Sequence, residues 1–210
     1  MNLFITGTDT GAGKTYVTAR LIRHLRRQGL DTVGFKPICC GSRGDAEALY
    51  EAADGALELN HVNPVWLRTP AAPYVAALIE NRAIDLDLIR ETFQHLRACH
   101  ASVLVEGVGG WLVPIARDYT VADLAKEMGL PVAVVVRNRL GALNHAALTV
   151  NHIQQSGQEC AGIILNDGLP ESVNEAGDPQ DIAVATNQSI LEDWLGVKTL
   201  YSLGSNQEII

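Results

Sequence analysis

A glycine-rich segment near the N-terminus carries the first residues that could do chemistry. Residues 7–15 read GTDTGAGKT, between a short apolar run and an amphipathic stretch. The backbone amides of such a strand–loop–helix turn can surround phosphate groups, as they do in a P-loop. Lys14 would place a positive charge beside the β- and γ-phosphates, and the Thr15 hydroxyl could coordinate Mg²⁺. The segment therefore predicts nucleotide binding.

The spacing of this loop departs from the strict G-x-x-x-x-G-K-T pattern. Thr8 stands where the first glycine would fall, and Gly7 lies one residue earlier. An ordinary glycine-rich turn that happens to carry a lysine would show the same residues. Partitioning-type ATPases share a G-K-G-G-x-G-K-T loop whose first lysine reaches across a dimer, whereas Asp9 occupies that position here. The difference favours an enzyme that consumes ATP to act on a small molecule.

Two carboxylates stand where metal ligands are expected. Glu106 ends an apolar run and enters a glycine-rich turn, which resembles a Walker B strand with Glu in place of Asp. The carboxyl ends of parallel strands face the ligand crevice of an α/β sheet. Asp45 begins a predicted helix, so its side chain could equally be an N-cap. With Thr15, the two carboxylates form a partial set of the oxygen ligands that Mg²⁺ prefers.

A second lysine closes another apolar run. Lys36 could lie at the surface with its ammonium in water, or it could point into the same crevice as Lys14. Two lysines beside a triphosphate would favour phosphoryl transfer to an anionic oxygen, where charge neutralisation and positioning do most of the catalysis.

The elements that would position these residues alternate along nearly the whole chain. Short runs rich in Val, Ile and Leu predict buried parallel strands at residues 3–6, 32–36, 102–106, 132–136 and 162–166. Amphipathic stretches predict helices at residues 14–28, 45–53, 87–98, 121–128, 144–156 and 182–195. This alternation predicts one α/β domain over residues 1–210, a doubly wound, mostly parallel sheet flanked by helices as in P-loop NTPases. We expect residues 167–179 to form a surface loop.

Composition narrows the class of protein. The chain has 210 residues, an apolar fraction of 47% and a net charge of −8, which excludes bulk disorder and a general nucleic-acid binder. No apolar run reaches the roughly 20 residues that span a bilayer. The four cysteines form no C-x-x-C pair, so we expect neither a zinc cage nor a disulfide framework. We expect a cytoplasmic protein without a leader peptide and without a nucleic-acid or membrane partner.

An ordered set of motifs resembles the dethiobiotin synthetase family. The motifs are GTDTGAGKT at residues 7–15, GFKP at 34–37, GS at 41–42, DA at 45–46, VNP at 62–64, PAAP at 70–73, VEGVGGW at 105–111, LGALNHAALT at 140–149 and ND at 166–167. Each motif is modest alone. Together they keep the family's order over most of the chain, which makes the resemblance specific.

The resemblance implies a role for each matching residue. The implied catalytic residues are Thr10, Lys14 and Lys36. The implied ATP-binding residues are Gly11, Ala12, Gly13, Lys14, Thr15, Glu106, Gly109, Asn166 and Asp167, with Asn166 reading the adenine. The implied Mg²⁺ ligands are Thr15, Asp45 and Glu106. The implied substrate-binding residues are Thr10, Lys36, Cys40, Ala142, Leu143 and Asn144. The last three would come from the neighbouring subunit of a homodimer, at a helix N-terminus suited to a carboxylate. Cys40 stands where the family often has Ser or Thr.

The implied activity is an ATP- and Mg²⁺-dependent ring closure in biotin biosynthesis. An amine of 7,8-diaminopelargonic acid would take up CO₂ as a carbamate, and ATP would phosphorylate the carbamate oxygen. The second amine would then attack this mixed anhydride, close the ureido ring of dethiobiotin and expel phosphate. The alternatives are a partitioning ATPase that binds a protein or DNA, and an ATP-dependent amidoligase or kinase of another small acid, because the fold alone does not fix the substrate.

Overall fold

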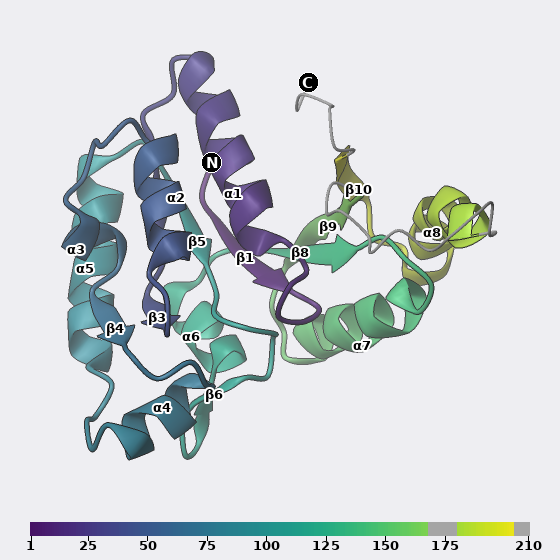
Figure 1. The fold of residues 1–210 in the computed structure, drawn as a ribbon. Coiled ribbons are helices and arrows are strands. Elements are labelled where there is room, and N and C mark those ends of the chain that lie inside the picture. Colours follow the sequence, from purple (N-terminus) through teal and green to yellow (C-terminus); the bar gives the residue numbers. More distant parts are fainter. Residues whose placement is uncertain (168–179, 204–210) are drawn as a thin grey trace.

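The computed structural model describes residues 1–167 and 180–203. A six-stranded sheet in the order β10-β9-β8-β1-β5-β2 forms its centre, and every neighbouring pair in it is parallel (Figure 1). Its strands are β1 (Leu3–Gly7), β2 (Thr32–Phe35), β5 (Ser102–Glu106), β8 (Val132–Arg137), β9 (Cys160–Asn166) and β10 (Thr199–Leu203). The predicted doubly wound parallel sheet is confirmed.

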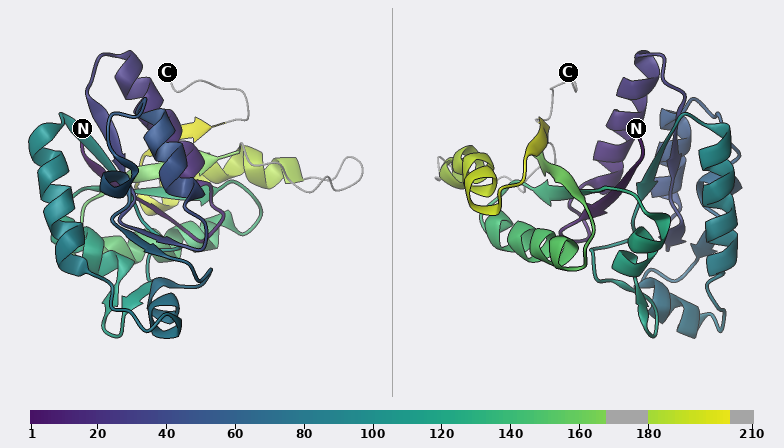
Figure 2. Two further views of the ribbon diagram at one scale, coloured as in Figure 1. Left: turned by 60° about the vertical axis from the view of Figure 1, so that its left-hand side comes forward. Right: turned by 180° about the vertical axis from the view of Figure 1, so that it is seen from behind.

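Helices cover both faces of this sheet, as the two views of Figure 2 show. The long helices are α1 (Lys14–Arg27), α2 (Gly44–Ala52), α5 (Leu86–Cys99), α6 (Val121–Met128), α7 (Ala142–Gln155) and α8 (Gln180–Leu195). Helices α1 and α2 share one hydrophobic cluster with the sheet, while α5, α6 and α7 share the other, with α8 packed beside α7. All six match predicted helices within a few residues.

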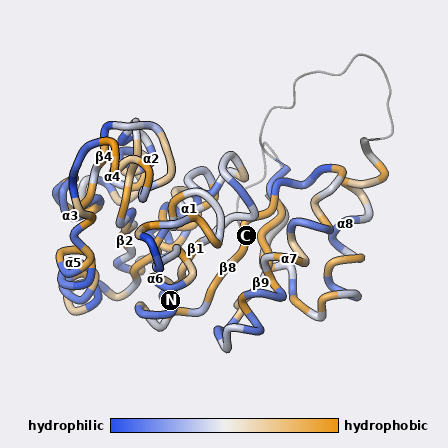
Figure 3. Tube along the Cα trace, turned by 90° about the horizontal axis from the view of Figure 1, so that it is seen from below, coloured by the Kyte–Doolittle hydropathy of each residue, from blue (hydrophilic) through white to orange (hydrophobic). Residues whose placement is uncertain are grey.

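Alternation of side chains along the strands produces these two clusters. Phe4, Val103 and Val134 belong to the cluster beneath α5–α7, whereas Ile5 and Leu104 belong to the cluster beneath α1 and α2. Successive residues of a strand point to opposite faces, so a strand covered on both sides must be apolar throughout. The hydropathy colouring of Figure 3 follows this rule along β1 and β8.

Several short elements were not predicted from the sequence. They are β3 (Ile38–Cys40), α3 (Leu59–Val62), β4 (Val65–Leu67), α4 (Pro73–Ile79), β6 (Pro114–Ala116) and β7 (Tyr119–Thr120), and the edge strand β10 of the central sheet was not predicted either. Strands β3 and β4 pair with each other in parallel and lie outside the central sheet. These pieces are too short for a periodic pattern, and tertiary packing decides their conformation.

The carboxyl ends of the central strands meet at one edge. The P-loop follows β1, Lys36 follows β2 and Glu106 ends β5. Gly34 in β2 lets the helices approach closely there, because an added Cβ would lie 2.8 Å from Ile22 Cδ1 and 2.8 Å from Leu49 Cβ. The predicted loop at residues 167–179 lies, apart from Asp167, outside the described residues. Within the described ranges, no helix has both the length and the apolar character needed to cross a membrane.

Candidate active site

The P-loop has the geometry of an anion-binding turn. Gly13 adopts a left-handed φ of 89° at the N-cap of α1, and no side chain caps that helix. No acidic residue lies in the first turn of α1, so its amide groups have no internal carboxylate to neutralise them. The buried Asn166 amide donates to Ala12 O at 2.9 Å and fixes the loop from behind. A ready-made phosphate site results.

A cavity of about 720 Å³ opens beside this loop. Among the predicted site residues its lining includes Thr10, Gly11, Gly13, Lys14, Thr15, Lys36, Cys40, Asp45 and Gly109. The volume falls within the range of small-molecule sites. The structure therefore brings together most of the residues that the sequence singled out, although they come from three separate segments of the chain, residues 10–15, 36–45 and 109.

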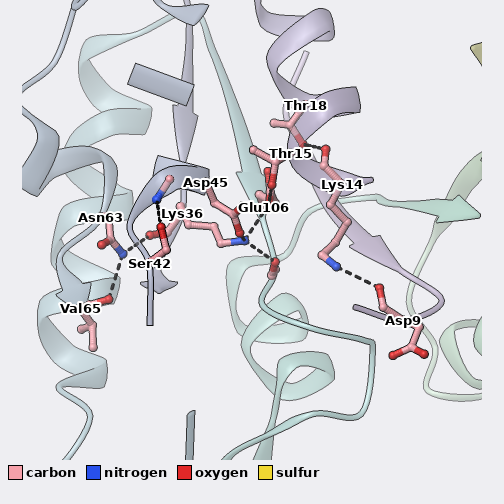
Figure 4. Close-up of polar contacts among 12 residues, drawn as sticks. Asp9, Lys14, Thr15, Thr18, Lys36, Ser42, Asp45, Asn63, Val65 and Glu106 are labelled. Carbon is pink, nitrogen blue, oxygen red and sulfur yellow. Dashed lines mark hydrogen bonds and ion pairs between the residues drawn. The ribbon is translucent and has the colours of Figure 1, made fainter. Parts of the chain in front are cut away.

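Lys36 forms an ion-paired cluster at this cavity. Its Nζ lies 2.6 Å from Glu106 Oε1 and 2.8 Å from Asp45 Oδ2, and it also donates to Gly107 O at 3.2 Å (Figure 4). Thr15 Oγ1 donates to the same Glu106 oxygen at 2.7 Å. Lys36 is only 2% exposed, so the surface alternative for this lysine is wrong. The N-cap alternative for Asp45 is also wrong, because Arg43 is the N-cap of α2 and Asp45 lies within the helix.

Opposing effects set the charge states in this cluster. Burial alone would lower the pKa of Lys36, but the Glu106 and Asp45 carboxylates outweigh burial and hold that pKa above its ordinary value. Burial would likewise raise the pKa of Asp45, yet the Lys36 ammonium holds it below its ordinary value. Lys36 is therefore a cation, and Asp45 an anion, at neutral pH.

Lys14 has a different environment in the same cavity. Its Nζ donates to the backbone oxygen of Asp9 at 3.1 Å. Burial and, second, the nearby Lys36 ammonium lower the pKa of Lys14 from 10.5 to about 8. The nearby carboxylates do not fully compensate the buried Lys14 ammonium. Binding of an anion beside it is therefore favourable, and a polyphosphate is such an anion.

The oxygen atoms around Glu106 fit a magnesium ion that arrives with a nucleotide. Glu106 is fully buried, and its Oε2 has no hydrogen-bond partner among the described residues. Thr15 Oγ1 and the Asp45 carboxylate lie on the same cluster. No group of three His, Cys, Asp or Glu side chains in the described ranges could hold a metal by itself. Two carboxylates and a hydroxyl fit Mg²⁺, which commonly completes its shell with phosphates and water.

Apolar residues to which the sequence assigned no role form another wall of the cavity. The stretch from Pro70 to Pro73 lines it together with Val108 and Val113. The PAAP motif at residues 70–73 had no assigned role in the sequence prediction, and it follows the unpredicted strand β4. Burial, followed by the Glu80 carboxylate, raises the pKa of the Cys40 thiol to about 11, so it stays protonated at neutral pH.

A second group of predicted residues lies away from the cavity. Ala142, Leu143 and Asn144 form the first turn of α7, and the cavity lining, taken over the described residues, does not include them. Gly141 caps this helix with a φ of 89°, and its first turn carries no acidic residue. Asn166 and Asp167, at and just after the end of β9, also lie outside the lining. Within one chain, the structure therefore does not bring the α7 turn into this cavity.

Comparison with solved structures places the fold among P-loop NTPases. The MinC:MinD cell division complex of Aquifex aeolicus matches with a TM-score of 0.59 at 14% identity, over 98% of this chain and 81% of the other. The septum site-determining protein MinD of Pyrococcus horikoshii, complexed with Mg-ADP, matches with a TM-score of 0.57 at 17% identity, over 98% of this chain and 82% of the other. At these identities the likeness shows the fold alone.

Comparison with curated sequences is more specific. A family model described as an AAA domain matches residues 1–205. The ATP-dependent dethiobiotin synthetase of Akkermansia muciniphila is 43% identical over 99% of this chain and 93% of its own length. That of Anaeromyxobacter dehalogenans is 47% identical over 80% of this chain and 78% of its own. With this identity over nearly all its length and with a P-loop beside a two-lysine cavity, the chain belongs to the ATP-dependent dethiobiotin synthetase family, a family of ligases.

Proposed function

We propose that the protein closes 7,8-diaminopelargonic acid and CO₂ into dethiobiotin at the expense of ATP, as a cytoplasmic enzyme of biotin biosynthesis. The observation that carries this proposal is that Lys14, Lys36 and the P-loop line the same cavity, in a chain whose relatives carry that enzyme's name. A cavity of this size has room for a polyphosphate end and a short aliphatic diamine together.

The P-loop amides and Lys14 would hold the phosphates of ATP. The uncompensated charge of Lys14 favours this role, because a bound phosphate would relieve the unfavourable burial of its ammonium. Asn166 would read the adenine beyond the loop, with Asp167, Ala12 and Gly109 close to the nucleotide. Asn166 already fixes the loop through Ala12 O, so its position would couple the base to the phosphates.

Thr15, Asp45 and Glu106 would hold Mg²⁺. The ion would supply charge neutralisation for the β- and γ-phosphates when bound. Glu106 Oε2 supports this assignment, because a buried carboxylate oxygen without a hydrogen-bond donor is well placed to accept a cation.

Lys36 and Thr10 would act on the substrate. One amine of the diamine adds to CO₂, which gives a carbamate and releases a proton. The carbamate oxygen then attacks the γ-phosphorus of ATP, so that the bond to ADP breaks and a carbamic–phosphoric anhydride forms. Lys36, fixed as a cation in the cavity, would hold the carbamate against the γ-phosphate and neutralise the charge between them. The second amine attacks the carbonyl carbon, phosphate leaves and the amine loses its proton.

The remaining binding residues would hold the aliphatic part of the substrate. Cys40 lies in the lining as a protonated thiol, which is a weak donor suited to a close polar contact. Ala142, Leu143 and Asn144 would bind the carboxylate from the second subunit of a homodimer. Leu140 and Leu148, 84% and 64% exposed beside this turn, support a subunit contact there.

The direct test is ADP release from Mg-ATP, with and without diaminopelargonic acid and bicarbonate, with mass detection of the product. Diamine-dependent ADP release, with a product one carbonyl heavier than the diamine and two hydrogens lighter, is the expected result. Nucleotide binding without stimulation by the diamine would overturn the substrate assignment. Stimulation by another small acid would establish an amidoligase or kinase instead, and stimulation by a protein or DNA a partitioning ATPase.

Complementation between subunits tests the dimer. A Lys36→Met chain and an Asn144→Asp chain, each inactive alone, should recover about a quarter of wild-type activity when mixed and exchanged, because half of the dimers would then contain one intact composite site. No recovery in mixtures that size measurements show to contain heterodimers would refute the composite site.

A further inference from the structure

Asn63 is a fully hydrogen-bonded buried amide that has no role in the chemistry proposed so far. It follows α3 and is 1% exposed. Its Nδ2 donates to Lys36 O at 2.8 Å and to Val65 O at 2.9 Å (Figure 4). Its Oδ1 accepts from Arg43 Nε at 3.0 Å. Both amide hydrogens and the amide oxygen are thus committed, which fixes the orientation of the side chain.

The bond from Asn63 to Lys36 O holds the chain at a point where the sheet does not. Strand β2 ends at Phe35, and Pro37 follows Lys36 without an amide hydrogen. Lys36 N donates to Val62 O at 2.7 Å, next to Asn63. Both backbone polar groups of Lys36 therefore bond to consecutive residues at the end of α3, Val62 and Asn63, and these bonds fix the backbone that carries the lysine side chain.

Arg43 connects the same amide to the helix that carries Asp45. Arg43 is the N-cap residue of α2, and its Nη2 donates to Asn63 O at 2.8 Å and to Asn60 Oδ1 at 3.1 Å. The guanidinium lies over the ring of Trp66, with Cζ 5.4 Å from the ring centroid. The guanidinium therefore makes several hydrogen bonds in its plane and also packs on an aromatic ring, a combination that a lysine could not reproduce.

We propose that Asn63 and Arg43 are positioning residues that set the separation of Lys36 and Asp45, and through them the alignment of the phosphoryl-transfer site. Asn63 fixes the backbone of Lys36, Arg43 fixes the start of α2 two residues before Asp45, and the two side chains bond to each other. Neither residue belongs to the cavity lining given by the described residues, so both act only through the ion pair. The consequence for turnover rests on the proposed function.

The test compares Asn63→Asp with Arg43→Lys in the full-length protein. Asn63→Asp keeps the acceptor for Arg43 but removes both N–H donors, so kcat for diamine-dependent ADP release should fall about 100-fold, the loss typical of a misplacement near 1 Å. The Kd of Mg-ADP should change less than about threefold, since the P-loop lies on other elements. Arg43→Lys should lower kcat about tenfold, and the double variant should lose less than the product of the two losses because the residues share one network.

Two controls separate positioning from general destabilisation. Asn60→Ala removes an exposed acceptor of the same Arg43 group without touching Lys36, and it should leave kcat within about twofold. Leu96→Val weakens the core that α5 packs against, at a residue outside the cavity lining, and should lower Tm while kcat of the folded protein is kept. If Asn63→Asp lowers Tm as Leu96→Val does but keeps kcat, the proposal is wrong.

A readout without turnover keeps this inference distinct from the proposed function. In a crystal structure of Asn63→Asp, Lys36 Nζ should no longer lie within hydrogen-bond distance of Asp45. An unchanged ion pair would overturn the positioning role even if the variant were slow. If the wild-type protein shows no diamine-dependent ADP release, the proposed function fails, and this structural comparison still decides the role of Asn63.

Discussion

Lys14 and Lys36 reach the same cavity from opposite sides and carry the same side chain, but their surroundings differ sharply. Lys36 lies between the carboxylates of Glu106 and Asp45, whereas the hydrogen bond described for Lys14 goes to a backbone oxygen. The pKa of Lys36 is accordingly raised, and that of Lys14 is lowered to about 8 by burial and by Lys36 itself. Residue type alone therefore predicts neither the charge state of a buried lysine nor its contribution to folding.

The difference separates two tasks within the site. Lys36 is neutralised by Glu106 and Asp45, so its charge is already balanced before any ligand binds. Lys14 is buried with too little negative charge around it, so its favourable partner must come from outside. A cavity with one satisfied and one unsatisfied cation is organised before ligand arrives and still attracts a polyanion.

The largest effect that this comparison predicts is on turnover. Lys36→Met should reduce diamine-dependent turnover about 1,000-fold, because it removes the cation that we propose aligns carbamate and γ-phosphate. The Kd of Mg-ADP should rise less than about fivefold, since the P-loop and Lys14 remain. Steady-state kinetics and a fluorescent nucleotide titration give the two values.

Two further variants test whether the loss is specific to Lys36. Lys126→Met removes an exposed lysine on α6 and should leave turnover unchanged. Lys36→Arg keeps the charge and the fold while changing the shape of the donor, and we expect it to remain slow. Normal turnover in folded Lys36→Met would remove Lys36 from the mechanism.

The next effect is on stability. Substitution of the two lysines should change the free energy of unfolding in opposite directions. Lys36→Met leaves the buried Glu106 without its cation and should lower the free energy of unfolding at pH 7 by about 3 kcal/mol. Lys14→Met removes a poorly compensated buried charge and should raise that free energy by roughly 1–3 kcal/mol. Urea unfolding without nucleotide measures both.

The pH dependence of the free energy of unfolding provides a check on the sign of the Lys14 effect. Because folding lowers the pKa of Lys14 from 10.5 to about 8, its destabilising effect is complete below pH 8 and is relieved as the pH rises toward 10.5. The advantage of Lys14→Met should therefore be smaller at pH 9 than at pH 7. Equal signs for the two lysine variants would contradict the comparison.

The smallest predicted effect is a proton taken up with the nucleotide. Lys14 should be about half protonated at pH 8 in the free protein, and bound phosphates should restore its full charge. Binding of preformed Mg-ADP should then take up about half a proton at pH 8 and about a tenth at pH 7. Calorimetry in buffers of different ionisation enthalpy measures the uptake, and an uptake that does not rise between these pH values would exclude a lowered pKa for Lys14.

Local features of the sequence predicted the main elements well. The apolar run before Glu106 and the P-loop at Lys14 sit where the strand and turn patterns place them, because both depend on neighbouring residues. The β3–β4 pair and α4 escaped prediction because they are short and rely on contacts with distant parts of the chain. Asn63 appeared in the sequence only as part of the VNP motif, because no neighbouring residue in the chain indicates that its side-chain amide bonds to Lys36 O.

Strand–helix alternation, the phosphate loop and the supply of lysines and carboxylates follow from the sequence alone, because they depend on side-chain periodicity and turn chemistry over a few residues. Which of the charged side chains contact one another depends on the tertiary packing. Lys36 and Glu106 are 70 residues apart in the chain, and the parallel pairing of β2 with β5 brings Lys36 Nζ to 2.6 Å from Glu106 Oε1. Electrostatic energy depends on separation and burial in space, so the same two lysine side chains become a fixed cation and a titratable one.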